Sequence, residues 1–154
     1  MKLLLDENVP LPMARIVRLL LKQHVVEHVA DLSGWAGTRD IDLYARAAAD
    51  GFQVVVTNDT KQLSRPLEVV AIAESGLHRI EFRQNHKHGG LVGLGAAIAT
   101  VCAGLPHALA ELDQADGQRL ISLNAVDPSQ QSRLRIVDPA SVPPKFWPAD
   151  SQNH

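Results

Sequence analysis

Apolar runs alternate with amphipathic stretches along the first half of the chain. Short runs rich in leucine and valine, each ending at a polar residue, predict buried strands. Apolar residues that recur every three to four positions predict helices between them. The predicted strands cover residues 2–5, 24–29, 53–57 and 77–82, and the predicted helices begin at Pro10, at Thr38 as N-cap and at Pro66. This alternation predicts βαβ units and therefore an α/β fold with a mainly parallel sheet.

The second half of the chain contains one long uncharged stretch. Residues 89–110 include no Asp, Glu, Lys or Arg, which is close to the length of a membrane span. Pro106 and several glycines interrupt the stretch, and they favour a helix of a water-soluble domain. We therefore expect a buried helix over residues 91–103, a break at residues 104–106, a second short helix after it, and no membrane segment.

Two more apolar runs near the C-terminus predict a hairpin. They cover residues 120–124 and 134–137, with turn-forming residues at 127–129 between them. Beyond the second run, residues 140–154 contain several prolines and show no periodicity. We interpret this last segment as a flexible tail that follows a folded domain over residues 1–139.

Composition narrows the class of protein. A chain of 154 residues with 45% hydrophobic and 21% charged residues is an ordinary single globular domain. The lone Cys102 lies in an apolar run, as expected for a reduced thiol in a cytoplasmic protein. The formal net charge is −2, so a nucleic-acid partner would need a local basic patch. Arg79, Arg83 and residues 86–88 are candidates for such a patch, with a plain solvated loop as the alternative.

Acidic residues occupy equivalent places in the predicted pattern. Asp6 follows the first strand, Asp59 follows the third, and Asp40 begins the helix after the second. Because the carboxyl ends of parallel strands meet at one edge of a sheet, we expect these acids to lie close together, where open α/β sheets bind ligands. Their polar neighbours in the sequence are Glu7, Asn8, Asp42 and Asn58.

Carboxylates gathered at one edge repel each other, and a cation relieves that repulsion. Oxygen ligands, with no cysteine pair beside them, favour Mg²⁺ or Mn²⁺ over Zn²⁺. Such ions support the hydrolysis of phosphodiesters. The alternative is ordinary turn chemistry, because Asp and Asn are common after strands and in the first turn of helices. On the residues alone both interpretations stay open.

Several segments resemble one family. The opening Leu-Leu-Leu-Asp-Glu-Asn-Val-Pro is similar to the start of the small PIN-like domains that are described as toxins of toxin–antitoxin pairs. The segments that carry the resemblance are residues 3–10, 37–43, 54–59, 120–122 and 133–136. The resemblance implies a three-layer α/β/α domain over residues 1–139, with a mainly parallel sheet and a C-terminal β-hairpin.

In this family, and in the VapC-type nucleases to which it is similar, acidic residues bind Mg²⁺ or Mn²⁺ for RNA cleavage. The resemblance implies that the catalytic, metal-binding acids are Asp6, Asp40 and Asp59, with Glu7 and Asp42 as further ligands and Asn8, Thr57 and Asn58 as supporting groups. It also implies an RNA substrate and an antitoxin protein as partner, and it leaves a homodimer open.

Lys61 departs from the family pattern. The family often carries a further acid two places after the position of Asp59, where this chain has Lys61. A non-catalytic PIN-like binding module is therefore an alternative to the nuclease. A phosphoacceptor receiver domain is the third choice, because Asp59 follows a third strand and Asp6-Glu7 form an acidic pair. A receiver also needs a lysine after the last parallel strand, and the sequence offers no convincing one.

Overall fold

A computed structural model describes residues 1–84 and 87–148 of the chain. It contains one sheet of five strands, all parallel, in the order β2-β1-β3-β4-β5. The strands are β1 (Lys2–Leu5), β2 (Val25–His28), β3 (Val54–Thr57), β4 (His78–Glu81) and β5 (Leu120–Ser122). The α-helices are α1 (Leu11–Leu20), α2 (Asp40–Ala49), α3 (Pro66–Ser75), α4 (Gly90–Asp113) and α5 (Gln130–Arg133), and 3₁₀ helices cover Val29–Asp31 and Gln62–Ser64.

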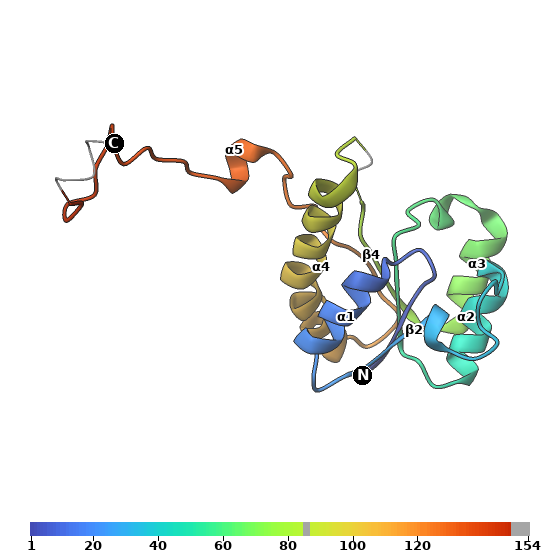
Figure 1. Cartoon of the computed structure of the whole chain (residues 1–154). Coiled ribbons are helices and arrows are strands. Elements are labelled where there is room, and N and C mark those ends of the chain that lie inside the picture. The colour runs from blue at the N-terminus through green and yellow to red at the C-terminus, as the bar shows by residue number, and fades with distance from the viewer. Residues whose placement is uncertain (85–86, 149–154) are drawn as a thin grey trace.

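The helices cover both faces of the sheet. Figure 1 shows α1 and α4 on one side and α2 and α3 on the other, which makes three layers. An all-parallel sheet needs this arrangement, because its strands are apolar on both faces. The predicted α/β fold in three layers with a parallel sheet is therefore confirmed.

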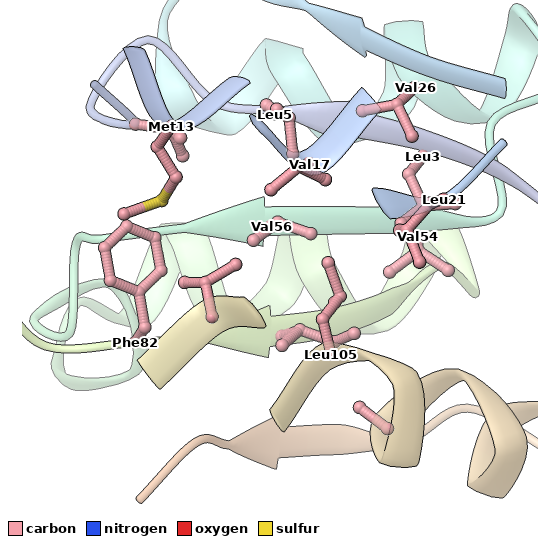
Figure 2. Close-up of a cluster of buried hydrophobic side chains, with 14 of the residues drawn as sticks. Leu3, Leu5, Met13, Val17, Leu21, Val26, Val54, Val56, Phe82 and Leu105 are labelled. Carbon is pink, nitrogen blue, oxygen red and sulfur yellow. The ribbon is translucent and has the colours of Figure 1, made fainter. Parts of the chain in front are cut away.

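Each strand contributes side chains to both layers in alternation. Leu3 and Leu5 of β1 pack in a core with α1 and α4, whereas Leu4 packs with α2 and α3 on the opposite face. Figure 2 shows part of the first core, where the side chain of Met13 reaches the ring of Phe82. Burial on both faces explains why the sequence shows continuous apolar runs instead of alternation.

The long helix α4 differs from the prediction. It continues without interruption through Pro106, so the predicted break at residues 104–106 is wrong. A proline inside a helix costs about 3 kcal/mol, because it removes one backbone hydrogen bond. Leu105 and Leu109 are buried in the core on either side of Pro106, and their burial offsets that cost. By length and composition α4 is able to cross a membrane, but in this structure Ala97, Val101 and Leu105 on one of its faces pack in the core beside the sheet.

The C-terminal hairpin is the second incorrect prediction. Strand β5 pairs in parallel with β4, and residues 134–137 form no strand. Asp127 accepts hydrogen bonds from Ser129 and Ser132, and the chain enters α5 instead of a hairpin turn. Ile136 is 77% exposed, so this segment does not pack against the sheet.

Figure 1 shows the chain after α5 extending away from the three layers. Phe146 and Trp147 in this segment are exposed. The last part of the predicted tail, residues 149–154, lies outside the described residues, as does His86 of the predicted basic patch. Whether residues 140–154 are flexible stays a prediction.

Candidate metal centre

Asp6 is buried at the carboxyl end of β1, which lies between β2 and β3 in the sheet. Only 3% of it is exposed, and its backbone N–H donates to the carbonyl oxygen of Val56 in β3 (3.0 Å). Its Oδ2 accepts hydrogen bonds from the Thr57 hydroxyl (2.7 Å) and the Asn8 amide (3.4 Å). A buried carboxylate is stable only when such donors satisfy it, so the strand ends hold Asp6 in one orientation.

The same threonine links Asp6 to Asp59. The Oγ1 of Thr57 accepts a hydrogen bond from the backbone N–H of Asp59 (3.0 Å) while it donates to Asp6. The Oδ1 of Asp59 accepts from the backbone N–H of Lys61 (2.9 Å), which closes a local turn. This leaves the Oδ2 of Asp59 directed toward Arg65 (3.1 Å).

Asp40 is the first residue of α2. The predicted cap is wrong, because Arg39 occupies the N-cap position and the Thr38 hydroxyl donates to the carbonyl oxygen of Trp35. The Asp40 carboxylate lies 3.8 Å from the Nη1 of Arg65. Burial raises the pKa of Asp40, and the negative charges of Glu68, Asp6 and Asp59 raise it further, although the charge of Arg65 opposes them. Acids of four separate segments therefore act on one another.

Glu68 completes the cluster, and the sequence analysis did not identify it. Carboxylate oxygens of Asp40, Asp59 and Glu68 all lie within 4.8 Å of one another. Glu68 comes from the first turn of α3, which packs beside α2. An acid in the first turn of a helix is explained by the helix dipole alone, so its sequence position gave little signal. The spacing from Arg65, three residues earlier, was the available clue.

The other predicted ligands lie outside this group of three. Glu7 is exposed, and Asp42 is exposed and paired with Arg39 (2.7 Å). Among the predicted supporting groups, Asn58 accepts a hydrogen bond from the backbone N–H of Gln84 (3.1 Å). The structure thus brings Asp40 and Asp59 together with Glu68 and places Asp6 close beside them in the buried layer.

Arg65 supplies the positive charge inside the cluster. Its Nη1 contacts Glu68 at 2.9 Å, Asp59 at 3.1 Å and Asp40 at 3.8 Å. Three carboxylates face one guanidinium, and this leaves an excess of negative charge even before Asp6 is counted. Such a set of oxygen donors fits a hard divalent cation such as Mg²⁺ or Mn²⁺.

A buried arginine, Arg79, donates a hydrogen bond to the backbone of the turn at Asp59. Arg79 was a candidate for a local basic patch, but it is fully buried in β4, so it belongs neither to such a patch nor to a solvated loop. It donates to the carbonyl oxygen of Asp59 (2.7 Å), to the carboxylate of Glu81 (2.6 Å) and to the side-chain oxygen of Gln62 (3.2 Å). The hydroxyl of Tyr44 donates to that same Gln62 oxygen (3.0 Å). Arg79 therefore holds the backbone of the Asp59 turn against the sheet.

The comparisons with known proteins identify one family. A family model described as a PIN like domain matches residues 1–84, which are 84 of the 154 residues. Searches of the curated proteins and of the solved structures find no match. The matched segment includes Asp6, Asp40, Asp59 and Glu68. Because the match covers more than half of the chain, the protein belongs to the PIN-like domain family.

Proposed function

We propose that this protein is a metal-dependent ribonuclease of the PIN-like family, which hydrolyses RNA phosphodiester bonds with Mg²⁺ or Mn²⁺. The observation that carries the proposal is the convergence of Asp40, Asp59 and Glu68, whose oxygens lie within 4.8 Å of one another at the edge of the sheet. Members of this family are often nucleases, and the donor set suits the ions that nucleases use.

In the proposed mechanism, Asp40, Asp59 and Glu68 would hold a divalent ion, which would supply Lewis-acid chemistry for phosphodiester hydrolysis. Asp6 adds a fixed negative charge beneath them, and the Thr57 hydroxyl keeps its carboxylate oriented. Burial and the neighbouring carboxylates raise the pKa of Asp40 in the metal-free protein, and a bound divalent cation would relieve the repulsion among these acids. No protein nucleophile is needed.

A role as a toxin rests only on the resemblance of the sequence to toxin-type PIN-like domains. A VapC-type toxin role would place the protein in the cytoplasm, with an antitoxin protein as inhibitor. A homodimer is compatible with this role. Growth arrest on expression, relieved by a small protein encoded beside it, tests the toxin role. Unaffected growth with abundant folded protein would count against it.

A non-catalytic binding module is the second candidate, and a contact in the site favours it. The guanidinium of Arg65 already makes ion pairs with the same three carboxylates that would hold the metal. Lys61 adds another positive charge beside Asp59. If these side chains neutralise the acidic cluster permanently, the protein keeps its fold but binds no catalytic metal ion.

A receiver domain stays the third choice. The strand order β2-β1-β3-β4-β5 is also that of flavodoxin-like folds, which include receiver domains. However, Leu123 and Asn124 follow β5 where a receiver needs lysine, and Asp59 is engaged by Arg65. Labelling by acetyl phosphate at Asp59 would revive this alternative.

The decisive experiment is cleavage of labelled single-stranded RNA in Mn²⁺, in Mg²⁺ and in EDTA. We expect cleavage in either metal, none in EDTA, and a loss of at least about a hundredfold in Asp59→Asn, since it removes a charged metal ligand. Asp42→Asn is the matched control, because Asp42 lies on the same edge but outside the group of three. Cleavage that persists in EDTA or in Asp59→Asn would refute the proposed mechanism.

A further inference from the structure

A polar cavity of about 490 Å³ lies directly beside the metal centre. Asp59 belongs to both, and the other walls come from the loops after β1, β3 and β4. The side chains that matter for binding are Asn8, Asn58, Lys61, Arg83 and Gln84. Its volume falls in the range of sites that hold a small molecule or one unit of a polymer.

Hydrogen bonds hold the walls of this cavity in place. The backbone N–H of Phe82 donates to the carbonyl oxygen of Thr57 (3.1 Å), which ties the ends of β3 and β4 together. The backbone N–H of Gln84 donates to Asn58 (3.1 Å), and that of Lys61 donates to Asp59 (2.9 Å). The two loops that carry Lys61 and Arg83 are therefore fixed relative to Asp59.

The two cations of the cavity are available for a ligand. Within residues 1–84 and 87–148, neither Lys61 nor Arg83 forms an ion pair, whereas Arg65 and Arg79 are engaged by carboxylates. Burial alone would raise the pKa of Glu81, but hydrogen bonds from Ser122 and Arg79 lower it, and the charge of Arg83 contributes last. Arg83 thus lies near Glu81, but within the described residues the ion pair of Glu81 is with Arg79.

We propose that this cavity binds a phosphate group of the RNA strand next to the bond that is cleaved, through Lys61 and Arg83. The proposal rests on the proposed function, since it names how that site holds its substrate. The chain carries a formal net charge of −2, and the acidic cluster repels a polyanion. Cations directly beside the cluster overcome this repulsion, and the amides of Asn8 and Gln84 offer hydrogen-bond donors to phosphate oxygens. Lys61 then has a role that an acid at its position would not have.

Binding of a labelled single-stranded RNA oligonucleotide, followed by fluorescence anisotropy in EDTA, tests the cavity without the metal. We expect the double variant Lys61→Ala/Arg83→Ala to weaken RNA binding about tenfold. The plot of the logarithm of the association constant against the logarithm of the salt concentration has a negative slope, and in this variant it should become less steep by about 0.7, the value for one phosphate contact on a single strand. The matched control Arg15→Ala/Lys22→Ala removes the same charge from exposed positions on and just after α1.

Equal losses of affinity in both double variants would overturn the proposal, because they would show only a general charge effect. Unchanged affinity in Lys61→Ala/Arg83→Ala would overturn it as well. Lys61→Arg, which keeps the charge, should bind as the wild type does. A thermal melt of each variant checks the fold, and both positions are exposed.

Cleavage in Mn²⁺ separates this inference from the proposed function. If the wild type cleaves RNA and the cavity variant binds and cleaves normally, the phosphate site is wrong and the nuclease stands. If the wild type does not cleave but the cavity variant loses RNA binding, the phosphate site stands and the nuclease is wrong. A raised KM with an unchanged kcat in the cavity variant would support both.

Discussion

The Nη1 atom of Arg65 lies 3.1 Å from the Oδ2 atom of Asp59. The same nitrogen reaches Glu68 at 2.9 Å and Asp40 at 3.8 Å, so one guanidinium nitrogen contacts the whole group of three acids. A divalent ion held by these carboxylates would be repelled by this guanidinium at short range. Binding of metal and the present position of Arg65 are therefore expected to exclude each other.

Replacement of Arg65 should strengthen metal binding. Arg65→Met keeps an apolar stem and removes the competing charge, so we expect the Kd for Mn²⁺ to fall by about tenfold or more. Titration calorimetry measures this directly. Arg39→Met serves as the control, because Arg39 pairs with Asp42 outside the group. A Kd that rises or does not change in Arg65→Met would show that Arg65 does not compete with the ion.

The raised pKa of Asp40 predicts a pH dependence of stability. Its folded-state pKa lies above the ordinary value of 3.8, so the protonated form favours folding and this contribution disappears as pH rises through the raised pKa. Asp40→Asn imitates the neutral form at every pH. In metal-free buffer, Asp40→Asn should therefore melt at a higher temperature relative to the wild type as the pH rises from 3.8 through the raised pKa of Asp40. A constant difference in differential scanning fluorimetry would contradict this account.

The hydroxyl of Thr57 should contribute measurably to stability. Thr57→Val keeps the shape of the side chain but removes the donor to Asp6 and the acceptor for the Asp59 N–H. Because Thr57 is buried, we expect the free energy of unfolding to fall by about 1–3 kcal/mol. Urea denaturation measures it, and Thr57→Ser, which retains the hydroxyl, should lose much less. Equal losses in both variants would assign the effect to packing.

The strands and the first acids were predictable because their signals are local. Three consecutive valines, as at residues 54–56, are expected in a strand only if both of its faces are covered, and this already indicates a parallel sheet. Once the strands are parallel, residues that follow β1 and β3 must meet at one edge. Asp6 and Asp59 were therefore identified without coordinates.

Tertiary packing decided the rest, because long-range contacts outweigh local preferences. Helix α4 continues through Pro106 since the apolar side chains on both sides of it are buried, whereas residues 134–137 pair with no strand and stay exposed. Glu68 and Arg65 reach the metal centre only because α3 packs beside α2. No spacing in the sequence reveals which helices become neighbours on one face of a sheet. The sequence by itself determined the first four strands and the edge where the acids gather, and the packing of α2 against α3 decided which carboxylates lie close together there.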